Sequence, residues 1–456
     1  MYTGSLGELH RPLAFTRQLK PPAGVSTPSS LPVPHSPVNT IPVEILLEIF
    51  VLCQSNGTRD DPLLPTLHYV STVCRHWRSV TMAAPHLWAK IALWNPQSLH
   101  ESIAEEWLIR SQSCPLTVII RHSASAPSVG WHTVAECTGR VFDLLMGHTR
   151  RWRSLTIDIA QIALPSNFAI HMEATPLLDH VDIADNDELP SSFIQLWESL
   201  LSRPSLRRLH WLNGGPGRSG YPRSIADLPW ERLTHVSGSF ILDDIFIDAL
   251  TRCQALEVLE LSSLVLPANA SKSTLQCFHP HLRVLAVTCE DLSGNELANH
   301  LICPNLRRLD IRFGGLLASW TDLLSRSGCA LDVLALWAYG SIAESDLLRF
   351  LSSPSLSSLT ALEVAVQPLS DFVVKTLTNK PERIFFPALG RLSLILKSCP
   401  DGSLTTMVES RLASADSALK HVSIYNHVSG MKTTSSLDSQ CFRHLRSIGF
   451  NINYIE

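Results

Sequence analysis

The chain has 456 residues and a net charge of −4, from 37 basic and 41 acidic side chains. This balance, without a basic stripe, argues against a nucleic-acid partner. No run of apolar residues approaches the roughly twenty that a membrane-spanning helix needs, so we expect no membrane partner. Charged residues make up only 17% of the chain, which favours a long apolar core.

Residues 1–37 carry no sign of a packed domain. The first twenty residues lack the apolar centre of a signal peptide. The following stretch is rich in proline and serine, which predicts a disordered tether. A regulatory phosphosite at Ser36, which precedes Pro37, stays open. Without a signal peptide we expect a cytoplasmic or nuclear protein, or both, whose cysteines are reduced thiols.

Residues 38–95 predict short helices. Pro42 suits the first turn of a helix, and Thr40 just before it is placed as a cap. Apolar side chains follow at helical spacing, namely Ile45, Leu46, Ile49, Phe50 and Leu52. After a loop at 54–66, a second apolar face comprises Leu67, Val70, Val73, Cys74, Trp77 and Val80. A third apolar segment follows Pro85. Three helices of this size bury only a small core, so the module must lean on a neighbour or a partner.

This stretch resembles an F-box. The resemblance is carried in order by Ile41-Pro42-x-Glu44-Ile45-Leu46-x-x-Ile49-Phe50, Val73-Cys74-Arg75-x-Trp77-Arg78 and Pro85-x-Leu87-Trp88. It implies a small helical bundle that binds the Skp-family adaptor, and through it the cullin, of an SCF-type ubiquitin ligase. The positions that it implies as adaptor-facing or core are Pro42, Ile45, Leu46, Ile49, Phe50, Val73, Trp77 and Trp88. Ile41 stands where the family usually has leucine, and the insert after Leu52 is longer than in the tightest F-boxes.

Residues 96–148 read as a linker with an irregular capping repeat. A helix is predicted over residues 105–112 and a strand over residues 116–120. Residues 149–456 then repeat a Leu-x-x-Leu-x-Leu pattern at separations of roughly 23 to 30 residues. The copies begin at Trp152, Leu178, Leu206, Leu233, Leu256, Leu282, Leu306, Leu331, Leu359, Leu389, Leu419 and Leu445. Amphipathic segments at 243–250, 296–301 and 344–351 predict helices between copies.

This periodicity is typical of leucine-rich repeats, in a degenerate form that mostly lacks the usual asparagine. One strand and one helix cannot bury an apolar face alone, but stacked copies share a continuous core. The fold class that we expect is α/β: a helical F-box followed by a right-handed leucine-rich-repeat solenoid, with a curved parallel sheet and helices on its outer face. The layout resembles F-box proteins of the fungal type.

Signals for catalysis, metals and cofactors are weak. Cys253, Cys303 and Cys329 precede repeat leucines and are interpreted as buried turn residues, and no Cys-x-x-Cys pair occurs. The glycine-rich stretch 213–220 lacks the Lys-Ser/Thr of a phosphate-binding loop and is interpreted as a loop between repeats. We therefore expect neither an enzyme nor a cofactor nor a metal site, although an unrecognised enzymatic site is the weakest open alternative.

Side chains alternate along a strand, so residues between the core leucines face the concave side of such an array. They include His180, Asp182, Val258, Glu260, Ala335, Arg391, His421 and Tyr425, and the substrate-binding candidates Arg208, His210, Arg308, Asp310, Arg312 and Trp337. Trp337 with the two nearby arginines Arg308 and Arg312 makes the best cluster, because Trp and Arg concentrate binding energy. The alternative is a mixed, solvated face.

Two functions stay open at this stage. The first is the substrate-recognition subunit of an SCF-type ubiquitin ligase, in which the F-box binds the adaptor and the repeats hold an unknown protein substrate. The second is an interaction scaffold outside any ligase, with a vestigial F-box.

Overall fold

In the computed structural model, the structure describes residues 41–55, 66–122, 130–159, 175–185, 204–213, 228–267, 275–367, 371–379, 385–396, 399–413, 418–426 and 436–455. The N-terminal tether predicted over 1–37, Thr40 and most of the glycine-rich stretch 213–220 lie outside these ranges. None of the helices in the described ranges is long and apolar enough to cross a membrane.

The chain begins with a group of short helices. They are α1 (Val43–Ser55), α2 (Thr66–Val73), α3 (Arg75–Met82) and the 3₁₀ turn η2 (Pro85–Ala89). The prediction of a single helix that carries Leu67 through Val80 is wrong, because the helix is interrupted at Cys74. This residue is extended (φ −157°, ψ 170°), and its Sγ accepts a hydrogen bond from the Trp77 N–H at 3.4 Å. Cys74 therefore caps a second helix instead of continuing the first.

One parallel sheet of fourteen strands organises the rest of the described chain. Its strands follow in chain order as β1 (Lys90–Trp94), β2 (Leu116–Arg121), β3 (Trp152–Ile159), β4 (His180–Asp185), β5 (Arg208–Asn213), β6 (His235–Ile241), β7 (Val258–Val265), β9 (Val284–Cys289), β11 (Arg308–Phe313), β12 (Val333–Ser341), β13 (Ala361–Gln367), β14 (Arg391–Leu396), β15 (His421–Asn426) and β16 (Asn451–Ile455). The sheet thus starts earlier than the repeats predict, because residues 90–94, expected in a third short helix, form its first strand.

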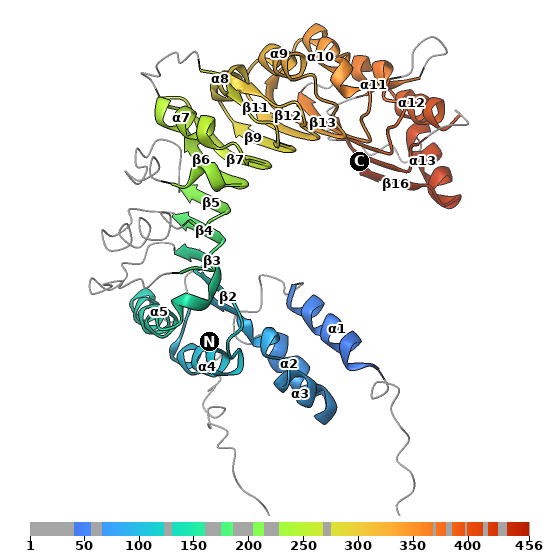
Figure 1. The fold of residues 1–456 in the computed structure, drawn as a ribbon. Helices are drawn as coiled ribbons and strands as arrows, with labels where there is room; N and C mark the ends of the chain where they lie inside the picture. The colour runs from blue at the N-terminus through green and yellow to red at the C-terminus, as the bar shows by residue number, and fades with distance from the viewer. Residues whose placement is uncertain are drawn as a thin grey trace, which may run out of the picture.

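Helices connect many of these strands. They are α4 (Ser98–Arg110), α5 (Trp131–Met146), η3 (Thr149–Arg151), η5 (Trp230–Arg232), α7 (Asp244–Arg252), α8 (Ser293–His300), α9 (Leu317–Ser327), α10 (Glu344–Leu351), η6 (Pro354–Leu356), α11 (Asp371–Leu377), α12 (Ser403–Leu412) and α13 (Leu437–Ser447). A separate parallel pair joins β8 (Cys277–Phe278) to β10 (Leu301–Ile302). Figure 1 shows a curved array with the helices along its outer side and the sheet along its inner side. The predicted helices at 243–250 and 344–351 are confirmed, and the one at 105–112 belongs to the longer α4.

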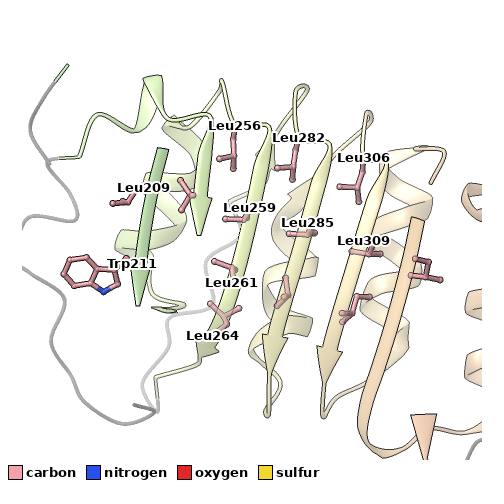
Figure 2. Packing of buried hydrophobic residues seen from close by; sticks show 14 of the residues in the cluster. Leu209, Trp211, Leu256, Leu259, Leu261, Leu264, Leu282, Leu285, Leu306 and Leu309 are labelled. Atoms are coloured by element: carbon pink, nitrogen blue, oxygen red, sulfur yellow. The ribbon is translucent and has the colours of Figure 1, made fainter. Parts of the chain in front are cut away.

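The core is built from columns of apolar side chains that cross the sheet. The first strand column is buried in all fourteen strands: Ile91, Val118, Leu155, Val181, Leu209, Val236, Leu259, Leu285, Leu309, Leu334, Leu362, Leu392, Val422 and Ile452. Figure 2 shows how the leucines of neighbouring repeats lie level with one another, as Leu259, Leu285 and Leu309 do. This in-register packing gives each repeat a buried face that it could not form alone.

Trp211 takes the place of a core leucine on β5 and is buried. Its partner on β6 is Gly238, which has a φ of +135°. The pairing of β6 with β7 shifts in register directly after this glycine. The positive φ of Gly238 therefore accounts for the irregularity of the β6 repeat, because only glycine adopts this conformation readily.

Candidate functional site

Two surfaces of the described chain are candidates for binding. The first is formed by α1, α2 and α3, and we call its exposed apolar residues the apolar helix surface. They are Val43, Ile45, Ile49, Val51, Leu52, Tyr69, Val73 and Met82. They account for eight of the twenty large apolar side chains that are exposed in the described residues. Such a concentration is typical of a protein-binding surface.

Helical periodicity explains how α1 divides into two faces. Ile45, Ile49 and Leu52 recur at i, i+4 and i+7 and are exposed, with 51% of Ile45 accessible. Leu46 and Phe50 lie on the other side and are fully buried. The helix therefore holds the core with one stripe and presents apolar side chains with the next.

The positions that the F-box resemblance implies as adaptor-facing or core fall into an exposed group and a buried group. Pro42, Ile45, Ile49 and Val73 are exposed, and the Pro42 carbonyl accepts the first helical hydrogen bond from the Leu46 N–H at 3.1 Å. Leu46, Phe50 and Trp88 are buried and can contribute only indirectly, through packing. Trp77 is half-buried, with its ring centroid 5.0 Å from that of Phe50. Leu52, Tyr69 and Met82 are exposed residues outside the predicted set, and for Leu52 the spacing from Ile45 and Ile49 was the available signal.

Trp88 connects the helices to the sheet. Its indole N–H donates a hydrogen bond to the Thr81 carbonyl at 2.8 Å, and its ring meets Trp107 edge-on at 6.1 Å. The Arg110 guanidinium lies over the same ring at 4.3 Å. The Gln54 side chain adds a hydrogen bond to the Leu87 carbonyl at 2.8 Å, which ties α1 to η2. The apolar helix surface is therefore held on an element that packs against the start of the sheet.

The second candidate surface is a hollow of about 270 Å³ on the inner side of the sheet, which we call the concave hollow. Five of the six predicted substrate-binding residues line it: His210, Arg308, Asp310, Arg312 and Trp337. Glu260, Ser237 and Glu363 are among its other lining residues. Glu363 was missed as a candidate, although its position between Leu362 and Val364 was a sufficient signal.

The predicted cluster of Trp337 with two arginines is divided in the structure. The Arg312 guanidinium lies over the Trp337 ring at 4.9 Å. Arg308 instead donates hydrogen bonds from Nε and Nη2 to one oxygen of Asp310, at 3.0 and 2.7 Å. The hydrogen bonds to Asp310, and to a smaller extent its charge, raise the pKa of Arg308, although desolvation opposes this.

Arg208 is the candidate that does not line the hollow. Its Nη2 lies 3.2 Å from Asp179 Oδ1, and Arg153 Nε lies 3.7 Å from the same carboxylate. His210 bridges the two regions, since its Nδ1 lies 2.6 Å from Ser237 Oγ and its Nε2 lies 3.8 Å from Asp182. Arg208 is thus occupied by an ion pair within the protein.

All eleven cysteines lie in the described residues and are free thiols. Cys253, Cys303 and Cys329 are buried, as predicted, and burial raises the pKa of both Cys253 and Cys303 to about 12. Among the described residues no group of three or more His, Cys, Asp or Glu side chains is placed to hold a metal ion. These thiols act as small apolar groups in the repeat turns.

Comparison with protein families identifies the N-terminal helices. Residues 38–94 match the F-box-like family model. No curated protein matches the chain. F-box domains generally bind Skp-family adaptors. Residues 38–94, which hold the apolar helix surface, are therefore an F-box-like domain.

Proposed function

We propose that this chain is the substrate-recognition subunit of an SCF-type ubiquitin ligase. The F-box-like domain binds a Skp-family adaptor and through it a cullin, and the sheet binds a protein substrate. The observation that carries the proposal is the F-box-like match at 38–94 together with the apolar helix surface inside it.

The adaptor half of the proposal is supported by where exposed apolar side chains gather. Eight of the twenty large apolar side chains that are exposed in the described residues lie on three short helices, and this gathering favours a binding surface. On α1, Ile45 and Ile49 stand beside the buried Leu46 and Phe50, so the surface has a fixed helical support. A partner helix or groove that covers this surface would gain the free energy of apolar burial at little conformational cost.

The substrate half is supported by the repeated architecture, which we interpret as a leucine-rich-repeat solenoid. Consecutive strands pair in chain order through the whole sheet, and the helices that connect them from α4 onward lie on its outer side in Figure 1. Polar and aromatic side chains between the core leucines face inward, and several of them converge on the concave hollow. Extended concave surfaces of this kind are what repeat proteins use to bind other proteins.

Within this proposal the chain has no catalytic residue of its own. It acts by holding adaptor and substrate in a fixed relation, so that ubiquitin transfer on other subunits becomes effectively intramolecular. Its expected location in the cytoplasm, in the nucleus or in both is part of the same proposal.

The test is co-purification of the full chain with a Skp-family adaptor. The variant is Ile45→Asp, and the matched control is Ile245→Asp on α7. The two isoleucines are 51% and 50% exposed, and both lie in the first turn of a helix, where a carboxylate is favourable. We expect wild type and the control to retain the adaptor stoichiometrically and Ile45→Asp to lose it, with all three equally folded by circular dichroism.

Either of two results would contradict the proposal. If wild-type protein does not retain the adaptor, the chain is a scaffold outside the ligase with a vestigial F-box. If Ile45→Asp retains it as well as wild type does, the apolar helix surface is not the adaptor site.

A further inference from the structure

The central row of the concave face alternates acidic residues with alanines. Glu260 on β7, Ala286 on β9, Asp310 on β11, Ala335 on β12 and Glu363 on β13 are partners in register. Carboxylates on every second strand stand about 9.6 Å apart, because neighbouring strands are about 4.8 Å apart. Alanine between them leaves space, and all five residues line the concave hollow.

Arg308, two residues before Asp310 on β11 and so on the same face of the strand, is already engaged. Arg308 binds Asp310 through two hydrogen bonds, which are the largest cause of its raised pKa. The charges of Glu260 and Glu363 act on Arg308 in the same direction. Three carboxylates therefore surround one guanidinium, which leaves little positive potential for an anionic ligand.

Some of the negative charge in the hollow lacks a close partner. In the described part of the chain, neither Glu260 nor Glu363 has a basic group within the 4.0 Å of an ion pair. The Oδ1 atom of Asp310 is buried and accepts no hydrogen bond there. Arg312 keeps its charge, but its guanidinium lies over the Trp337 ring and forms no ion pair with these carboxylates in the described residues.

The hollow is thus lined by three carboxylates against two guanidinium groups, with an aromatic ring beside them. We propose that the concave hollow binds a lysine or arginine side chain from an extended basic segment of the substrate protein. The cation would lie over an alanine between two carboxylates, where Glu260 or Glu363 accepts its hydrogen bonds and Asp310 adds negative charge. This inference rests on the proposed function, since it names the chemistry of the substrate that the receptor would hold.

A phosphorylated segment is the competing class of substrate, and charge argues against it. A phosphate close to Arg308 would also lie close to Asp310, Glu260 and Glu363. Like charges placed across an interface weaken binding and exclude the wrong partner.

The experiment uses the full chain incubated with a Skp-family adaptor. The probes are Gly/Ser peptides with a central Lys-Ser-Arg, with Glu-Ser-Glu, or with phosphoserine in place of the basic residues. A carbodiimide that joins carboxylates to amines traps weak binding, and mass spectrometry locates the crosslinks. The variant is Glu260→Gln with Glu363→Gln, and the matched control is Glu257→Gln with Glu290→Gln, which alters two exposed glutamates outside the hollow.

We expect only the basic peptide to crosslink, at Glu260, Asp310 or Glu363. In fluorescence anisotropy without the carbodiimide, the hollow variant should bind this peptide about tenfold more weakly while the control leaves binding unchanged, because two carboxylates that pair with the cations of the peptide are neutralised. Preferred capture of the phosphoserine peptide, or equal loss in variant and control, would overturn the inference. Adaptor retention is measured in the same samples, so a failure of the hollow and a failure of the ligase assignment are told apart.

Discussion

Replacing Gly238 with alanine should disturb the sheet far more than the added methyl group suggests. Gly238 lies on β6 opposite Trp211 of β5, with a φ of +135°. A Cβ at this position would overlap the carbonyl group of Trp211 and lie 2.8 Å from its nitrogen. All of these atoms are backbone, so no change of side-chain rotamer relieves the overlap. One strand must move away from the other.

The magnitude follows from comparison with Gly328, the C-cap of α9. Gly328 also has a positive φ, +59°, but a Cβ there would meet nothing within 4 Å. Gly328→Ala should therefore cost only the left-handed backbone preference, about 1–2 kcal/mol. Gly238→Ala adds backbone strain and a displaced strand pair, which together make about 3–5 kcal/mol.

The assay is chemical unfolding of the full chain, with hydrogen exchange measured on peptides that cover β5 and β6. We expect Gly238→Ala to lower stability by more than Gly328→Ala and to increase exchange first at these two strands. A second substitution, Trp211→Leu, should not rescue the variant, because the overlap involves the Trp211 backbone. Equal costs for the two glycine variants, or rescue by Trp211→Leu, would refute the reasoning.

Two further predictions concern buried ionisable groups. Burial raises the pKa of Cys253 and Cys303 to about 12. Iodoacetamide at pH 8 should therefore label the partly exposed Cys53 before either of them, as measured by peptide mass spectrometry. Early labelling of Cys303 in the folded protein would contradict this prediction. Burial also lowers the pKa of His122 from 6.5 to about 4. The unfolded chain therefore binds a proton there between these pH values while the folded chain does not, and stability should fall by up to about 3 kcal/mol as the pH drops through this window. His122→Gln should flatten that part of the unfolding profile, whereas a substitution at the exposed His132 should not; equal effects would rule out His122 as the source.

The sequence determined the repeated part of the chain to a large extent. Local sequence spacing is enough to predict the core leucines of each repeat, and the alternation of side chains along the chain predicts the strand at 116–120. The same alternation assigned His210, Arg308, Asp310, Arg312 and Trp337 to the inner face of the sheet. These assignments succeed because a two-residue period fixes which face of a strand each side chain occupies.

Only the tertiary structure decided which of those residues share a site. Arg208 has the same position in its repeat as Arg308, yet it pairs with Asp179, while Arg308 pairs with Asp310. The alternation of acids and alanines also becomes visible only when strands are aligned in register. Pairing partners lie some 25 residues apart in the chain, and no local pattern specifies them.

The F-box-like domain shows the same division. Its motifs identify the module, and the family match agrees over residues 38–94. The motifs did not separate Ile45, which is exposed, from Leu46 and Trp88, which are buried. A short helix has apolar residues on more than one side, and packing of α1 against α2 and α3 selects the side that becomes core. Burial is a property of the assembled neighbours, so it is decided only when the chain has folded.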